Sequence, residues 1–266
     1  MFSFDARVRY SECDDQGYLS WEGLLDLFQD CSSLQSELLG VGVDYLKEKR
    51  RAWVLNFWQI HVNRFPKLPE KIEVITQPYE IKGFFGLRNF ILRSREEPKE
   101  PVALTPEEEA MPPHMRIHDP YSLAYANSVW TFLDLDTLHP ARVTEPWLSA
   151  YETAERIPMD YGPRKIKVPE ELQTLEPLTV KRHNLDTNGH MNNAWYVRMA
   201  FDALEEAKQV KAGERREVKE LRVEYRKAAY LEDVLYPKVA ILPEEQRGIV
   251  VLADEEGTPY SVVEVR

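Results

Sequence analysis

Three residues near position 190 carry the side chains that acid–base chemistry needs. The stretch Leu185–Tyr196, LDTNGHMNNAWY, places Asp186, Asn188 and His190 two residues apart, just before a predicted helix. The free N–H groups at a helix start stabilise negative charge over such a turn, and a carboxamide can polarise a carbonyl group there. An imidazole can take a proton from water near neutral pH, with a carboxylate fixing its tautomer. The set fits hydrolysis of an activated acyl group by water.

The same residue types are also common in ordinary turns. Asp, Asn and Gly are favoured in turns and helix caps. His190 fits equally well as a half-buried histidine without a chemical task. Spacing alone leaves both interpretations open.

Other kinds of catalytic site have little support in the sequence. Cys31 lies on the apolar face of a predicted helix, which indicates a buried structural thiol. Cys13 lies beside Asp14 and Asp15, whose negative charge raises the pKa of a thiol. We find no G-x-S-x-G elbow, phosphate loop or G-x-G-x-x-G, and we expect neither a metal nor a cofactor.

The composition predicts a folded, acidic, cytoplasmic protein. Of the 266 residues, 43% are hydrophobic and 11% aromatic, which is enough for a sizeable core. The 45 acidic and 34 basic residues give a net charge of -11, which opposes binding to nucleic acid or to an anionic membrane. Long apolar runs and a signal-like N-terminus are absent from the sequence, and two cysteines are too few for a disulfide framework.

The elements around the trio occur twice along the chain. Shifting the sequence by 172 residues sets Val8–Asp30 over Val180–Asp202, so that Asp14 falls on Asp186. Each copy predicts a short strand, a polar turn closed by glycine and an amphipathic helix. The first helix runs from an N-cap at Ser20 to a glycine just past its end, and the second begins after an asparagine.

Strand-like runs follow each predicted helix. In the first half they cover 53–65, 71–81, 84–92 and 128–136, and in the second half 219–229, 233–242, 247–254 and 259–266. One helix in each half cannot alternate with many parallel strands. The predicted class is therefore α+β, with a long helix packed on an antiparallel β-sheet in each of two units.

The predicted units have different roles along the chain. Residues 1–137 form the first unit, which includes an acidic, proline-rich insertion at 94–121. Residues 138–177 contain six prolines and form a linker. Residues 178–266 form the second unit, which carries the trio.

The chain resembles the fatty acyl-ACP thioesterase family over nearly its whole length, apart from the insertion. Residues 186–193 are similar to the D-x-N-x-H-x-N-N signature of that family, and Leu221–Leu235, LRVEYRKAAYLEDVL, is similar to its later strand segment. Val8–Asp14 and Trp53–Leu55 resemble the opening strand and the strand after the first helix.

The resemblance implies a tandem, or double, hotdog fold. It also implies an enzyme that hydrolyses acyl-acyl carrier protein to free fatty acid, with the acyl carrier protein as partner. Catalytic residues lie in the second half of such proteins, and the first half shapes the acyl-chain tunnel. In agreement, Gln16 and Tyr18 occupy the first-copy places of Asn188 and His190. The two units can pair within one chain, as single hotdog units pair in a dimer. Both a monomer and a homodimer are therefore compatible with the sequence.

One departure from the family limits what the resemblance carries over. Plant members have a glutamate and a cysteine where this chain has Ala228 and Ala229. We therefore hypothesise that Asn188 and the helix N-terminus hold the thioester oxygen while His190, oriented by Asp186, activates water. An acyl-CoA thioesterase and a catalytically silent acyl-binding or regulatory hotdog protein remain as alternatives.

Two further groups of residues are candidates for binding. Leu24, Phe28, Trp53 and Phe57 are candidates for the tunnel wall, although such residues are also ordinary core residues. The basic run Lys47–Arg51, KEKRR, is typical of a solvated loop face. Its alternative role is docking of an acidic carrier protein, with Lys165 among the further candidate contacts.

Overall fold

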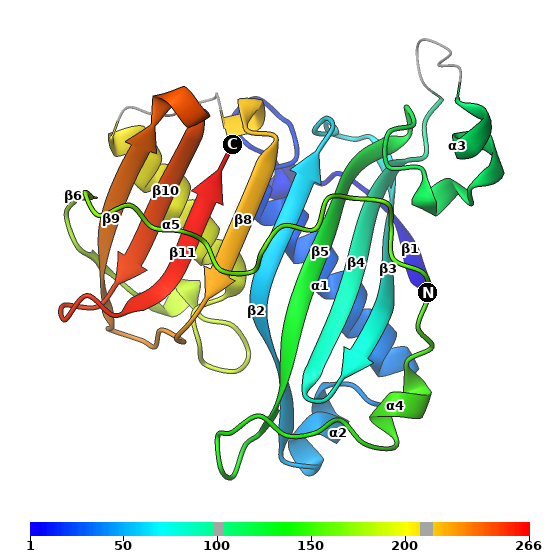
Figure 1. The fold of residues 1–266 in the computed structure, drawn as a ribbon, viewed down its shortest axis with the longest axis horizontal. Coiled ribbons are helices and arrows are strands. Elements are labelled where there is room, and N and C mark those ends of the chain that lie inside the picture. Colours follow the sequence, from blue (N-terminus) through cyan, green and yellow to red (C-terminus); the bar gives the residue numbers. More distant parts are fainter. Residues whose placement is uncertain (98–103, 208–214) are drawn as a thin grey trace.

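A single antiparallel sheet carries both long helices on one of its faces (Figure 1). The computed structural model describes residues 1–97, 104–207 and 215–266. The strands are β1 (Phe2–Arg7), β2 (Arg51–Val62), β3 (Lys71–Lys82), β4 (Phe85–Ser94), β5 (Ser122–Asp134), β6 (Gln173–Thr174), β7 (Leu178–Thr179), β8 (Glu220–Tyr225), β9 (Val234–Leu242), β10 (Arg247–Ala253) and β11 (Pro259–Val265). The α-helices are α1 (Trp21–Leu38), α2 (Val43–Glu48), α3 (Pro106–Ala110), α4 (Trp147–Ala150) and α5 (Asn193–Glu206). Short 3-10 helices cover Tyr10–Glu12, Pro113–Met115, Arg182–Asn184, Arg215–Glu217 and Pro243–Glu245.

The two halves of the chain have the same strand connectivity. The sheet order is β1-β3-β4-β5-β2-β8-β11-β10-β9-β6, and β7 pairs with β9. In each half, the strand that follows the long helix (β2 or β8) lies at the centre of the sheet. The three antiparallel strands that come next in the chain extend from it toward the outer edge, where the short first strand of that half pairs. The halves meet where β2 pairs with β8, from Phe57 opposite Glu224 to His61 opposite Glu220. The predicted α+β class is confirmed.

Both long helices begin at the caps that the sequence indicates. The Ser20 hydroxyl accepts a hydrogen bond from the Gly23 N–H at 3.0 Å, and α1 ends before Gly40, whose φ is +71°. The Asn192 carboxamide accepts from the Ala194 N–H at 2.8 Å at the start of α5. These local signals fix where each amphipathic helix starts, and its apolar face then packs on the sheet.

The apolar core runs without a break from one half into the other. The rings of Trp21 on α1 and Phe201 on α5 stack at 5.9 Å between centroids. Phe28 packs against Trp58 and Phe90, at 6.0 Å and 5.2 Å. All five side chains are almost fully buried, and each contributes roughly 1.5–3 kcal/mol by leaving water. The shared core holds α1 and α5 side by side.

The segment after β5 is packed against the sheet along part of its length. It crosses the sheet face opposite the helices (Figure 1). The Gln59 amide on β2 donates to the Asp160 carbonyl at 3.0 Å and accepts from the Gly162 N–H at 2.9 Å. Ile157 and Ile166 of this segment are buried against the sheet. The proline-rich connection, predicted as a linker, therefore covers the outer face of the sheet along part of its length.

The acidic insertion at 94–121 falls between β4 and β5. Residues 98–103 of it lie outside the described residues. Of the described part, Met115 and Ile117 join an apolar cluster on β3, β4 and β5. β5 begins at Ser122, earlier than the predicted run at 128–136. The alanines near its start have low strand propensity, so the sequence pattern did not indicate this part of the strand. Among the residues described, no helix combines the length and apolar character needed to span a bilayer.

Candidate active site

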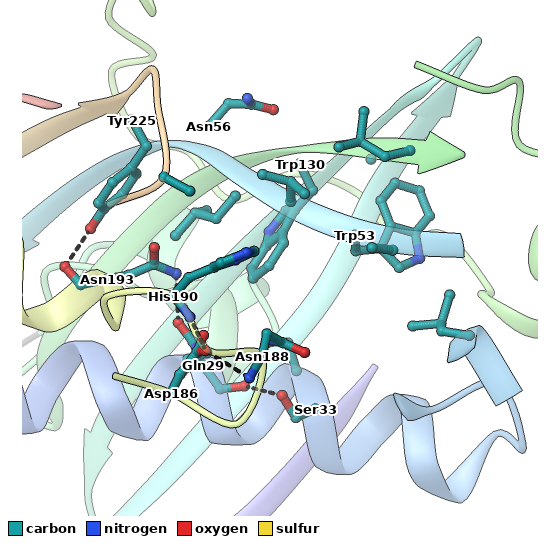
Figure 2. A pocket seen from close by; sticks show the side chains of 18 of the residues that line it. Gln29, Ser33, Trp53, Asn56, Trp130, Asp186, Asn188, His190, Asn193 and Tyr225 are labelled. Atoms are coloured by element: carbon teal, nitrogen blue, oxygen red, sulfur yellow. Dashed lines mark hydrogen bonds between the residues drawn. The ribbon is translucent and has the colours of Figure 1, made fainter. Parts of the chain in front are cut away.

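The Asp186 carboxylate builds the turn that carries the other two residues of the trio. Its Oδ1 accepts hydrogen bonds from the Asn188 N–H at 2.8 Å and the His190 N–H at 3.2 Å (Figure 2). The Asp186 N–H donates to the His190 carbonyl at 2.7 Å. Gly189 closes the turn with a φ of +77°, a conformation that suits glycine. The turn fixes the backbone from which Asn188 and His190 project.

The first copy contains the same turn, with Gln16 and Tyr18 at the places of Asn188 and His190. Asp14 Oδ1 accepts from the N–H groups of Gln16 and Tyr18, each at 2.9 Å, and Gly17 has a φ of +78°. The role of the aspartate in both copies is thus to hold the backbone. The hydrogen bond expected between the Asp186 carboxylate and the His190 ring is not among those that the described residues form. In this structure Asp186 positions the histidine through the backbone.

A cavity of about 810 Å³ brings Asp186, Asn188 and His190 together with residues of the first half. Its walls come from the turn, α1, α2, β2, β3, β4, β5 and the segment after β8. Figure 2 shows the turn between α1 and the strands, with Trp53 and Trp130 further along the pocket. Among the described residues that line the cavity, Asp186 is the only carboxylate. His190 is the only histidine among the same described residues.

The His190 ring is half-buried and packs against a tyrosine. The edge-to-face contact with Tyr230 has a centroid separation of 4.9 Å and an interplanar angle of 87°. Tyr230 lies in the segment after β8 and lines the same cavity. The contact restricts the ring on one side, and His190 also lines the cavity.

A glutamine from the first half completes the polar part of the site. The Asn193 side chain at the start of α5 donates to Gln29 Oε1 on α1 at 3.0 Å, and the Tyr225 hydroxyl donates to the Asn193 carbonyl at 3.0 Å. Figure 2 shows this chain of contacts next to His190. Neither Gln29 nor Tyr225 was among the predicted site residues. Gln29 lines the cavity from the same side of α1 as Ser32, Ser33 and Ser36, and no pattern in the sequence distinguished it from an ordinary polar helix residue.

Of the four candidates for the tunnel wall, only Trp53 lines the cavity. Leu24 and Phe28 are fully buried between α1 and the sheet. Phe57 points to the opposite sheet face, where its ring lies 5.7 Å from the guanidinium of Arg222. Trp58 contacts α1, and successive side chains of a strand alternate between the two faces of the sheet. The Phe57 side chain therefore lies on the face away from α1. These three candidates are core residues.

The alanines that depart from the family pattern offer no catalytic group. Ala228 lines the cavity. Ala229 is fully buried, and its N–H donates to the Tyr196 hydroxyl at 2.9 Å. Neither a glutamate nor a thiol occupies this part of the wall.

The two cysteines lie outside the cavity wall. Cys31 is fully buried, and burial raises the pKa of its thiol to about 12. Burial, followed by the charges of Asp14 and Glu12, raises the pKa of Cys13. Both thiols are therefore protonated and unreactive near neutral pH.

The turn of the first copy is covered by an arginine. Arg216 approaches Asp14 to 3.2 Å, and its guanidinium lies 4.1 Å from the centre of the Tyr18 ring. Asp14 and Arg216 line a separate cavity of about 500 Å³. The two equivalent turns therefore differ in the cavity that they line as well as in residue type.

The basic run at the end of α2 reaches the cavity through Lys47 and Arg51. Three of its members are ion-paired: Lys49 with Glu48, Arg50 with Asp136 and Arg51 with Asp134. Lys47 is exposed, lines the cavity and has no ion pair among the described residues. Lys165, another docking candidate, lies in the segment on the opposite sheet face.

Comparison with known proteins places the chain in a family. The family model described as "Acyl-ACP thioesterase N-terminal domain" matches residues 1–104, and the one described as "Acyl-ACP thioesterase C-terminal domain" matches residues 167–253. No curated protein matches the sequence. An acyl-ACP thioesterase from Bacteroides thetaiotaomicron has a similar structure, with a TM-score of 0.78 and 22% identity over 99% of this chain and 96% of that one. The 12:0-ACP thioesterase from Umbellularia californica gives a TM-score of 0.75 at 15% identity, over 100% of this chain and 96% of that one. Since both domain models of one family match, and the fold agrees along the whole chain, the protein belongs to the acyl-ACP thioesterases, a family of thioester hydrolases.

Proposed function

We propose that this protein hydrolyses the thioester of acyl-acyl carrier protein and releases free fatty acid, which terminates fatty acid synthesis. The observation that carries the proposal is the presence of Asn188 and His190 on the wall of one large cavity. Membership of the acyl-ACP thioesterase family supports the carrier protein as the source of the acyl group.

In the proposed mechanism water attacks the thioester carbonyl directly. The Asn188 carboxamide and the N-terminus of α5 donate to the carbonyl oxygen and stabilise the negative charge that develops on it. His190 takes a proton from the attacking water, and the C–S bond breaks as the proton passes to the departing thiolate. A thioester is already activated, so the scheme needs no acyl-enzyme and no thiol nucleophile. Asp186 acts by holding the turn.

We further propose that the two halves are tandem hotdog units with divided roles. The equal connectivity of the halves and their pairing through β2 and β8 support this interpretation. The matching hydrogen bonds around Asp14 and Asp186 support it independently. On this proposal residues 1–137 supply most of the cavity wall, residues 138–177 connect the units and residues 178–266 supply the acid–base group.

The proposal is tested by measuring free fatty acid release from acyl carrier protein and from CoA charged with the same acyl groups. His190→Ala is expected to lose about a hundredfold or more in turnover, the share of a general base. His183→Ala is the matched control, because that ring is exposed, packs against Trp195 and is outside the cavity. Equal rates for His190→Ala and the unmodified protein would exclude the assignment. Faster hydrolysis of CoA substrates would favour an acyl-CoA thioesterase.

The absence of hydrolysis from either carrier would favour a silent acyl-binding protein. Ala228 and Ala229 are the observation behind that alternative, because they remove a carboxylate and a thiol from the family pattern. Retained binding of acyl groups without turnover is the result that would establish it.

A further inference from the structure

One arginine in the cavity wall is buried without a counter-ion from residues 1–97, 104–207 or 215–266. Arg88 on β4 is 8% exposed and lines the cavity. No carboxylate lies within ion-pair distance of it in the part of the chain that the structure describes. A guanidinium stays charged in proteins, and a buried charge is costly unless it is paired and hydrogen-bonded. An unpaired arginine in a binding cavity therefore needs an explanation.

The protein satisfies only part of the hydrogen-bonding capacity of Arg88. Its Nη1 donates to Gln35 Oε1 and, at 3.1 Å, to Thr76 Oγ1. Its guanidinium carbon lies 5.4 Å from the centre of the Tyr151 ring. Nε and Nη2 have no acceptor among the described residues, and neither is fully enclosed by protein. Several donors of a charged group thus remain available to a molecule in the cavity.

The surroundings of Arg88 are polar as well. The Ser36 and Tyr151 hydroxyls, which both line the cavity, lie 2.7 Å apart. Ser36 also donates to the Ser32 carbonyl at 2.9 Å. On another part of the wall, the Trp53 Nε1–H is buried without an acceptor. A wall built only for a hydrocarbon chain would be apolar throughout, whereas this one offers unused donors.

This polar region is remote from the catalytic end of the cavity. Gln29 contacts Asn193 at the catalytic end, and Ser36 lies seven residues further along α1. A rise of 1.5 Å per residue places Ser36 about 10 Å further along the helix axis. Arg88 and Ser36 both contact Tyr151. Arg88 would therefore contact a part of the bound acyl chain that is far from the thioester carbonyl.

We propose that the cavity selects acyl groups that carry an oxygen function remote from the thioester, with Arg88 donating hydrogen bonds to that oxygen. The inference rests on the proposed hydrolysis and specifies its substrate class. A terminal carboxylate supplies the missing counter-ion, and a hydroxyl or oxo group supplies an acceptor alone. Burial of the guanidinium lowers the pKa of Arg88 from its usual value, which a bound anion would oppose.

The test compares three acyl thioesters with equal numbers of carbon atoms: one unsubstituted, one with a hydroxyl group near the far end and one with a terminal carboxylate. A hydrogen bond to a charged group is worth about 1.5–3 kcal/mol, so kcat/KM for an oxygenated chain should exceed that for the unsubstituted chain by about tenfold or more. Arg88→Met should abolish this ratio. Arg51→Met is the matched control, because Arg51 lines the same cavity but is paired with Asp134, and the ratio should persist.

A direct binding measurement separates this inference from the proposed function. Calorimetric titration of the protein with free dicarboxylic, hydroxy and unsubstituted acids of equal length needs no turnover. Tighter binding of an oxygenated acid, lost in Arg88→Met, supports the inference even if no thioester is hydrolysed. Two results would overturn the inference: tighter binding of the unsubstituted acid by the unmodified protein, or an affinity ratio between oxygenated and unsubstituted acids that is unchanged in a folded Arg88→Met. Either result would leave Arg88 a structural residue.

Discussion

The Asn193 side chain on α5 donates to Gln29 Oε1 on α1 at 3.0 Å, which joins the two halves of the chain next to the turn that carries Asn188 and His190. The hydroxyl of Tyr225 on β8 holds the Asn193 carbonyl from the other side. The cavity is therefore assembled across the seam: the proposed acid–base group comes from the second half, and the first half supplies a polar neighbour and most of the wall.

Removing this contact should weaken the coupling of the two helices. A double-mutant cycle with Gln29→Ala and Asn193→Ala is expected to give a coupling energy of about 1 kcal/mol in urea unfolding, the usual net value of a neutral hydrogen bond. Gln29→Ala should also lower turnover, because the start of α5 loses its fixed position. Strictly additive unfolding energies would show that the contact contributes nothing to stability.

Substitutions of Asp186 should distinguish its role in holding the turn from a direct role of its charge in the reaction. Asp186→Asn keeps an Oδ1 acceptor for the two backbone N–H groups, so it should retain the melting temperature and most of the turnover. Asp186→Ala loses both bonds, at about 1 kcal/mol each, and should lose turnover as the turn loosens.

Asp14→Ala is the control for this pair. It removes the same two backbone bonds from the first copy and should cost similar stability without the same loss of turnover. If Asp186→Asn melts normally but is as inactive as His190→Ala, the negative charge of Asp186 takes part in the reaction itself.

The cysteines should be dispensable. Because the pKa of Cys31 is raised to about 12, its thiolate is almost absent near neutral pH, and iodoacetamide should leave it unlabelled in the folded protein. Cys13→Ser combined with Cys31→Ala should retain turnover, with some loss of stability from the small cavity at Cys31. Abolished hydrolysis in a folded double variant would point to a covalent intermediate.

Trp53 should set acyl-chain preference, whereas Phe28 should not. Trp53→Ala enlarges the cavity, so the preferred chain length in a hydrolysis panel should increase. Phe28→Ala should destabilise the protein by about 3–5 kcal/mol without changing that preference, because Phe28 lies in the core. An unchanged chain-length profile in Trp53→Ala would remove this residue from the wall that contacts substrate.

Lys47 should contribute to use of a carrier protein. Lys47→Glu is expected to raise KM for acyl-acyl carrier protein, with little change for small thioesters, because it places a negative charge at the cavity edge against an acidic partner. Added salt should raise the same KM in the unmodified protein. Lys165→Glu on the opposite face is the control. Equal effects of the two substitutions would indicate a general charge effect instead of docking.

The sequence by itself determined the features that depend on neighbouring residues. Turn chemistry predicted the polar turn at Asp186, capping residues predicted where both long helices start, and hydrophobic periodicity predicted the class and most strands. The repeat at a shift of 172 residues predicted the second turn, whose backbone hydrogen bonds match the first. These signals are local, so no knowledge of distant contacts was needed.

Only the tertiary structure decided which distant side chains share the cavity. Leu24 and Phe57 look like Trp53 in sequence, yet a register shift in β2 between Leu55 and Phe57 and the packing of α1 leave only Trp53 on the wall. The surroundings of Arg88, which hold no carboxylate from the described residues, likewise depend on the packing of α1, β3 and β4. Such relationships arise from strand register and helix packing across the whole chain, and no local pattern of residue types specifies them.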